Sequence, residues 1–194
     1  MRSYQSKSKS CARNWASNVT VGLPNREQAI QILKQENCPP QVIKHCLAVT
    51  TLALEIAVKL QARGIQIDLA LVEAGGILHD LGRAKSHEVN HGLVGAQMAK
   101  SLGLPQPIVD IIKRHVGAGI TEEEAEWLEW PQGNYVPTTL EEKVVCYADK
   151  RIDHDKVTSI EDEIHKLQSK GFPEAAERVR NLHNEITHLL GEKQ

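Results

Sequence analysis

The sequence is poor in aromatic residues and has no long apolar run. Aromatic side chains make up only 4% of its 194 residues. A core with so few rings has to be built from Leu, Ile, Val and Ala, a composition that favours helices over a β-sandwich. The most apolar stretch, 69–81, is interrupted by Glu73, His79 and Asp80. We therefore expect no membrane-spanning segment and no membrane partner.

The chain also lacks an excess of charge of one sign and closely spaced pairs of cysteines. The formal net charge is only −2, so the chain lacks the basic excess that is typical of proteins bound to duplex nucleic acid. Four cysteines are present without a C-x-x-C pair, which excludes a zinc ribbon or a dense disulfide framework. A reducing compartment is the default for such a protein, and we expect it to be cytoplasmic.

Acidic residues are absent from the first 26 positions, where five Lys or Arg and five Ser occur. This composition is typical of an organelle transit peptide and also of a disordered tail. We treat residues 1–24 as a disordered or cleaved segment and place the fold in 25–194.

Helix signals follow one another from Asn25 onward. Asn25 with Gln28 and Thr121 with Glu124 have capping-box spacing, while Gly64 is placed to end a long apolar helix. The pattern predicts helices over 25–37, 42–63, 69–81, 89–102, 105–115, 121–128 and 139–149, and two more starting at 159 and 173. With no strand of useful length, linker or repeat, the fold class is all-α, a single helical domain.

Nine histidines are many for this length, and several lie beside carboxylates at inner faces or ends of apolar helices. Each of these groups has an ordinary alternative: a histidine can be a satisfied core residue, and an aspartate can pair with a nearby Lys or Arg. An acidic residue at a helix C-terminus is nevertheless unfavourable without a cation. One convergent metal site explains the whole set, which comprises His45, His79, Asp80, His91, His115 and Asp149.

The ligand types indicate which ions fit. Imidazole with carboxylate suits Fe, Mn, Co, Ni or Zn, and one carboxylate can bridge two ions. Adjacent helix residues project about 100° apart, which would let His79 hold one ion while Asp80 reaches between two. We therefore expect divalent transition-metal ions, two in number.

The same residues resemble the HD-domain metal-dependent phosphohydrolases. The family pattern is a His, a later His-Asp doublet and a distant Asp in an all-helical domain, matched here by His45, His79-Asp80 and Asp149. The phrases around the doublet, around His91-Gly92 and around His115 resemble the binuclear branch, and Gly82-Arg83 resembles its HD-Ile-Gly subgroup. The resemblance covers about residues 25–155.

The resemblance implies a ligand assignment and an activity. His45, His79, Asp80 and Asp149 would hold the first ion, and Asp80, His91 and His115 the second. Together the ions would share a hydroxide that cleaves a phosphoester or phosphoanhydride of a small phosphorylated substrate, a nucleotide in type. Arg83, assisted by Lys85, would bind a second phosphate, although a salt bridge from Arg83 to Glu73 or Glu88 is an equal alternative.

Two other functions remain open at this point. Mixed-valent di-iron oxygenases use the same scaffold and ligands, and a silent nucleotide-binding module is a third reading. The sequence does not choose the substrate, the metal or the oligomeric state, for which a homodimer is one option.

Overall fold

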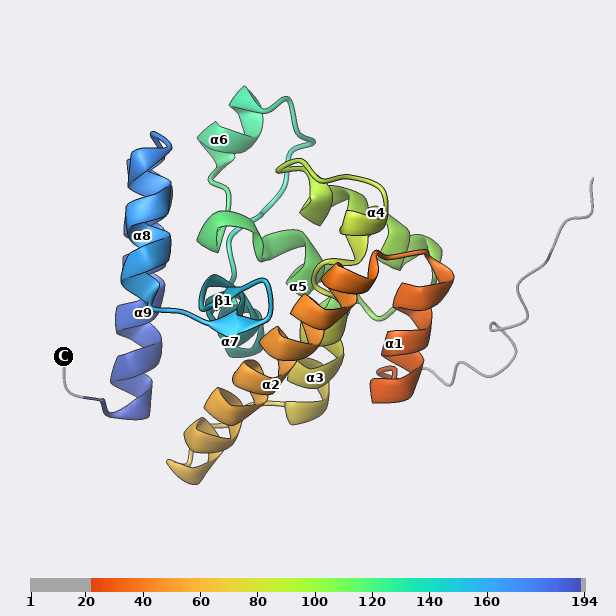
Figure 1. The fold of residues 1–194 in the computed structure, drawn as a ribbon, viewed down its shortest axis with the longest axis horizontal. Helices are drawn as coiled ribbons and strands as arrows, with labels where there is room; N and C mark the ends of the chain where they lie inside the picture. The colour runs from red at the N-terminus through yellow and green to blue at the C-terminus, as the bar shows by residue number, and fades with distance from the viewer. Residues whose placement is uncertain (1–21, 193–194) are drawn as a thin grey trace, which may run out of the picture.

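The computed structural model describes residues 22–192, so the predicted disordered or cleaved segment 1–24 lies almost wholly outside the described residues. The described chain is a helical bundle with one very short β-hairpin (Figure 1). The predicted all-α class is confirmed. The helices are α1 (Arg26–Gln35), α2 (Pro40–Ala62), α3 (Leu69–Leu78), the 3₁₀ helix η1 (Leu81–Ala84), α4 (His91–Ser101), α5 (Gln106–Arg114), the 3₁₀ helix η2 (Val116–Ala118), α6 (Glu122–Trp127), α7 (Leu140–Lys150), α8 (Ile160–Ser169) and α9 (Pro173–Leu190).

The predicted caps form as the spacing requires. The Asn25 side chain accepts a hydrogen bond from the Gln28 backbone N–H, and the Gln28 side chain accepts one from the Asn25 N–H, both at 2.9 Å. Thr121 and Glu124 make the same reciprocal pair at the start of α6. These bonds satisfy backbone donors that a helix start leaves without a partner, so they fix where each helix begins.

Helix α2 runs through the middle of the bundle and packs against α3 and α7 (Figure 1). Two glycines allow the close approach of α3 to its neighbours: a Cβ on Gly75 would collide with Ile111 of α5, and one on Gly76 with Thr50 of α2. Helix α3 is thereby buried from Val72 to Leu78 except at Glu73. The His79-Asp80 doublet follows directly after the end of α3, and both residues are buried.

Two local predictions were wrong. Helix α3 ends at Leu78, and the chain continues as η1, so Arg83 does not lie on an extension of the same α-helix. A short hairpin was also missed: β1 (Ile152–Asp153) pairs antiparallel with β2 (Lys156–Val157). Two-residue strands are too short to produce an alternating pattern.

Helix α2 is the one helix of the described chain that is long and apolar enough, by length and composition alone, to cross a membrane. The prediction of no membrane-spanning segment rested on the shorter run at 69–81 and did not consider α2. Core helices of folded domains have the same properties, and seven residues of α2 are buried in this bundle.

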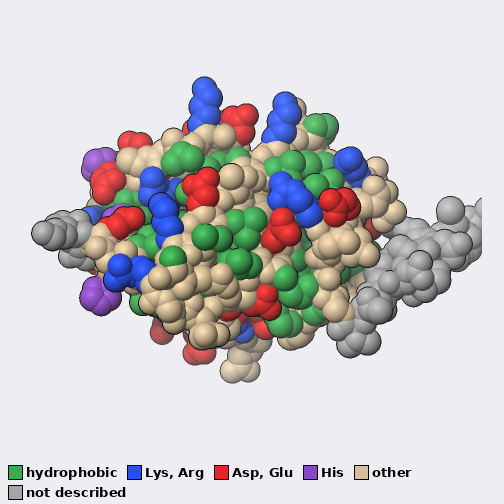
Figure 2. Space-filling view, turned by 90° about the horizontal axis from the view of Figure 1, so that it is seen from below, with side chains coloured by type: hydrophobic (Ala, Val, Ile, Leu, Met, Phe, Trp, Pro, Cys, Tyr) green, Lys and Arg blue, Asp and Glu red, His purple; other side chains and the backbone are tan. Residues whose placement is uncertain are grey.

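The surface carries both signs of charge. In the face shown in Figure 2, basic and acidic side chains alternate with apolar ones, and no broad area has a single sign. This mixture agrees with the small net charge of the chain.

Candidate metal centre

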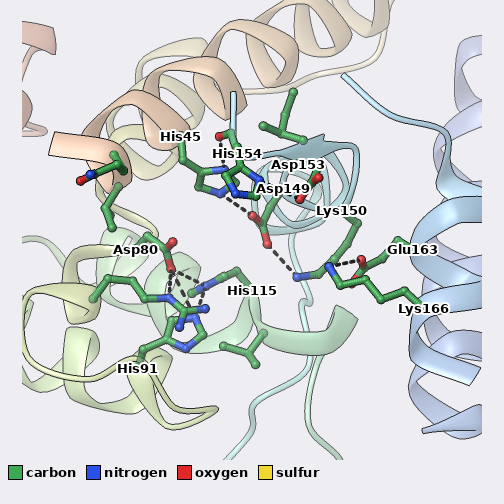
Figure 3. Close-up of a pocket in the computed structure, with 15 residues that line it drawn as sticks. His45, Asp80, His91, His115, Asp149, Lys150, Asp153, His154, Glu163 and Lys166 are labelled. Atoms are coloured by element: carbon green, nitrogen blue, oxygen red, sulfur yellow. Dashed lines mark hydrogen bonds and ion pairs between the residues drawn. The ribbon is translucent and has the colours of Figure 1, made fainter. Parts of the chain in front are cut away.

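The six predicted ligands come together although they derive from separate elements. Five of them line one open cavity: His45 of α2, Asp80, His91 of α4, His115 and Asp149 of α7 (Figure 3). The sixth, His79, is fully buried beside this cavity; its Nε2 lies 3.5 Å from Asp149 Oδ1 and 3.9 Å from Asp80 Oδ2. The convergence expected from helix faces is present.

All four site histidines use the same ring nitrogen for support. Their Nδ1 atoms lie 2.7 to 2.9 Å from backbone carbonyl oxygens, and a carbonyl can only accept, so Nδ1 carries the proton. The acceptors are the carbonyls of His154, Gly76, Glu88 and Ile112 for His45, His79, His91 and His115 respectively. Each neutral ring therefore presents the lone pair of Nε2 to the site, which is how metal-binding histidines are oriented.

The ligand atoms form two adjoining groups. In the first, Asp149 Oδ1 is 2.9 Å from His45 Nε2 and 3.5 Å from His79 Nε2. In the second, Asp80 Oδ1 is 3.3 Å from His91 Nε2 and 3.4 Å from His115 Nε2. His79 belongs to both possible sets of ligands, with atoms within 4.8 Å of one another. Each group supplies the imidazole and carboxylate atoms that could hold a divalent metal.

Two contacts make little sense without a cation. His91 Nε2 and His115 Nε2 are 3.1 Å apart, yet in neutral rings that donate through Nδ1 both atoms are acceptors. His79 Nε2 is buried and makes no hydrogen bond to any described residue. A buried polar atom without a partner is costly, and a metal ion supplies the partner that all three nitrogens lack. The residues present therefore fit a divalent metal.

Burial and neighbouring charge favour metal-binding protonation states at three of the ligands. Burial lowers the pKa of His91 to about 3 and also lowers the pKa of His115. For His79, burial alone would lower the pKa, but the Asp80 and Asp149 carboxylates raise it. For Asp149, burial alone would raise the pKa, but the adjacent Lys150 ammonium and the contacts with His45 and His79 lower it. Neutral imidazoles and ionised carboxylates are the forms that bind metals.

The two basic residues predicted to bind phosphate lie in different places. Arg83 lines the cavity; its Nε is 3.4 Å from Asp80 Oδ1 and its Nη1 donates to the His87 carbonyl at 2.7 Å. Neither alternative salt bridge forms: Glu73 pairs with Arg26, and the ion pair of Arg83 is with Asp80 instead of Glu88. Lys85 is exposed and lines a separate depression with Val94 and Met98 instead. The expectation that Lys85 assists at the site is corrected: η1 turns it away.

Several cavity residues were missed from sequence. His154, assigned to a solvated tail, closes the β1–β2 turn, and its carbonyl accepts the His45 Nδ1–H at 2.9 Å. Lys150 donates to Asp149 Oδ2 at 2.7 Å, and Glu163 and Lys166 of α8 complete the wall (Figure 3). The position of Lys150 directly after a ligand was a usable signal, whereas nothing in the local sequence of α8 indicates the cavity.

Comparison with known proteins identifies the family of the chain. The HD domain family matches residues 42–152, more than half of the chain, so the chain belongs to the HD domain family, as predicted. An uncharacterized protein of Methanocaldococcus jannaschii is 42% identical over 84% of this chain and 98% of its own length.

Other relatives are longer or more distant. A protein named tRNA (cytidine(56)-2'-O)-methyltransferase from Picrophilus torridus is 36% identical over 98% of this chain, which spans only 54% of that relative. Among solved structures, the HD domain of the L. monocytogenes phosphodiesterase PgpH in complex with cyclic-di-AMP has a TM-score of 0.51 at 17% identity, covering 86% of this chain and 98% of that one. At this identity the likeness shows a shared helical fold.

Proposed function

We propose that this chain is a metal-dependent phosphohydrolase that cleaves a phosphoester or phosphoanhydride of a nucleotide-type substrate. His45, His79, Asp80 and Asp149 would hold one divalent ion, and Asp80, His91 and His115 a second. The observation that carries the proposal is the facing pair of acceptor nitrogens on His91 and His115, 3.1 Å apart beside Asp80.

The residues of the chain have distinct parts in such a reaction. When bound, a pair of divalent ions lowers the pKa of a coordinated water and polarises a phosphoryl oxygen. Asp80 directs Oδ1 toward His91 and His115 and Oδ2 toward His79, an arrangement suited to a shared ligand. Arg83, which already reaches Asp80, would donate to a non-bridging phosphate oxygen. Asp149 is held between His45 and Lys150 by one oxygen each.

The nucleotide character of the substrate is supported by what similar proteins are named for. The PgpH HD domain was solved with cyclic-di-AMP, and the Picrophilus torridus relative is named for tRNA. The second of these names favours a phosphodiester of RNA as an alternative substrate. The small net charge of this chain argues for a short single strand over a duplex.

The test is elemental analysis of purified protein together with hydrolysis of a substrate panel. The panel holds a mononucleotide, a cyclic dinucleotide, a dinucleoside polyphosphate and a short single-stranded RNA. We expect up to two transition-metal ions per chain and phosphate or nucleotide release from at least one substrate. Asp80→Ala should abolish both metal loading and hydrolysis, whereas Asp110→Ala, outside the cavity on α5, should leave both unchanged.

Three results would contradict the proposal in different ways. Hydrolysis that persists in Asp80→Ala would overturn the two-ion assignment. Oxygen consumption without release of phosphate would identify an oxygenase. Metal loading with no turnover of any substrate would indicate a binding module.

A further inference from the structure

The cavity extends past the ligand cluster to helix α8. Its far wall is built by Lys150 at the end of α7 and by Glu163 and Lys166 of α8 (Figure 3). Lys150 lies within the residues 42–152 that match the HD domain family, whereas Glu163 and Lys166 of α8 lie beyond them.

This wall carries the ammonium groups of Lys150 and Lys166 beside the carboxylates of Glu163 and Asp153, and the lysines have donors that no described residue uses. Lys150 is mostly buried, with 12% of its side chain exposed, and its one hydrogen bond to a described residue goes to Asp149 Oδ2. An ammonium group has three donors. Lys166 is paired with Glu163 at 3.1 Å and is half exposed toward the opening. A surface pair between residues three apart contributes little to stability, so the fold does not require it.

The second cationic position of the cavity lies at the other end. Arg83 contacts Asp80 and Lys150 contacts Asp149, so each of the two ligand carboxylates has one basic side chain beside it. A substrate with its scissile phosphate at the ligands would thus have a basic group on each side.

We propose that Lys166, with Lys150 beside it, forms a second anion subsite that binds a phosphate of the substrate other than the one cleaved. This inference rests on the proposed function and narrows its substrate class to nucleotides with at least two phosphates. Glu163 is the competing carboxylate: it aligns Lys166 and partly neutralises it when no phosphate is bound.

The test uses two dinucleotides that differ by one phosphate. ApA has a single internal phosphodiester, and pApA has the same bond plus a terminal phosphate. We expect metal-loaded protein to bind pApA about five- to tenfold more tightly than ApA by calorimetry, with a matching difference in KM, because a partly desolvated ammonium–phosphate contact has this order of strength. The preference should fall as salt is raised.

Variants on α8 distinguish a specific loss of phosphate binding at the subsite from a general loss of folding or metal binding. Lys166→Ala should raise the Kd and KM for pApA to the values for ApA. The Kd and KM for ApA and the metal content should stay unchanged. Glu163→Gln removes the competing charge and should tighten pApA alone. Lys170→Ala, an exposed lysine at the end of the same helix and outside the cavity, is the matched control and should behave as the parent protein. A dinucleoside tetraphosphate, run beside pApA, distinguishes anhydride-linked from ester-linked phosphate as the source of the extra group.

Equal affinity for ApA and pApA, including no measurable binding of either, would overturn the subsite. So would a loss of pApA preference in Lys170→Ala as large as in Lys166→Ala. Failure of the proposed function looks different, because protein that binds no metal and hydrolyses nothing in the panel fails before the two dinucleotides are compared.

Discussion

At the scale of single residues, the direction of the Nδ1–H bond sets the chemistry of the four site histidines. Each ring gives this proton to a carbonyl and keeps Nε2 for the cavity. Arg83 is the other residue whose local contacts suggest a role, since it is anchored by the His87 carbonyl while its Nε faces Asp80.

Replacing Arg83 tests that role. Arg83→Ala should leave metal content intact and raise the KM for a phosphorylated substrate roughly tenfold or more, because a charge-assisted hydrogen bond contributes about 1.5–3 kcal/mol. The measurement is steady-state kinetics beside elemental analysis. Lys85→Ala, two residues further on but outside the cavity, should change neither quantity. A fall in metal content in Arg83→Ala would instead assign it a structural role.

The sequence was sufficient to predict which residues converge, because each ligand sits at an inward face or an end of an apolar helix. It was not sufficient for Lys85. The predicted helix ended at 81, and nothing in the sequence indicated that η1 follows it and leaves Lys85 outside the cavity.

At the scale of elements, η1 packs against the start of α4 with no room for a side chain at Gly82. A Cβ there would overlap the His91 carbonyl and crowd Gly95 N. Gly82→Ala should therefore displace His91, lower the free energy of unfolding by about 1–3 kcal/mol and reduce metal occupancy. Thermal unfolding and elemental analysis measure both effects. Gly22→Ala, which meets nothing within 4 Å, is the control, and an unchanged metal content in Gly82→Ala would contradict the prediction.

The β1–β2 hairpin is the second element that supports a ligand. His154 has a φ of 60°, and its carbonyl, not its ring, contacts His45; the side chain is 88% exposed. His154→Pro fixes φ near −65° and should move the backbone carbonyl of residue 154 away from His45. His154→Gly accepts a positive φ and should keep that carbonyl in contact with His45.

We expect His154→Pro to lower occupancy of the ion that His45 would hold and His154→Gly to retain it. Metal content after dialysis against a fixed free-ion concentration is the measurement. Equal loss in both variants would mean that the ring itself matters.

Element boundaries followed from the caps, but the hairpin did not follow from any pattern. Its strands have two residues each, and its importance comes from a contact 109 positions away in sequence. Such a contact depends on tertiary packing and leaves no local signal.

At the scale of the whole molecule, the ions would join α2, η1, α4, α5 and α7 through the ligands that already converge in the cavity. An ion that binds only the folded state stabilises it by about 2.7 kcal/mol when its free concentration is 100 times Kd. Removing the metals with EDTA should lower Tm by several degrees, since about 1 kcal/mol corresponds to roughly 2–4 °C at this size.

Differential scanning calorimetry with and without chelator checks this prediction. The Asp80→Ala protein should show little or no shift on addition of EDTA. A shift as large as that of the parent protein would place the bound ions elsewhere.

The fold class was predictable because amphipathic periodicity and capping pairs recur along the described chain. The wall supplied by α8 was not, because Glu163 and Lys166 read as an ordinary solvated helix face until the packing of α8 on α9 is known. The proposed anion subsite lies in that wall, so the sequence alone gave no indication of it.

The carbonyls that orient the histidines come from different distances along the sequence, and this difference affects the two proposed ions unequally. His79, His91 and His115 are each aimed by a residue three positions earlier in the chain, so these rings adopt their orientation as soon as the local turn forms. The His45 ring is oriented by the carbonyl of His154 in the hairpin, 109 positions later in the sequence. Disrupting the 152–157 turn should therefore weaken binding of the ion that His45 would hold and leave the ion at Asp80, His91 and His115 in place.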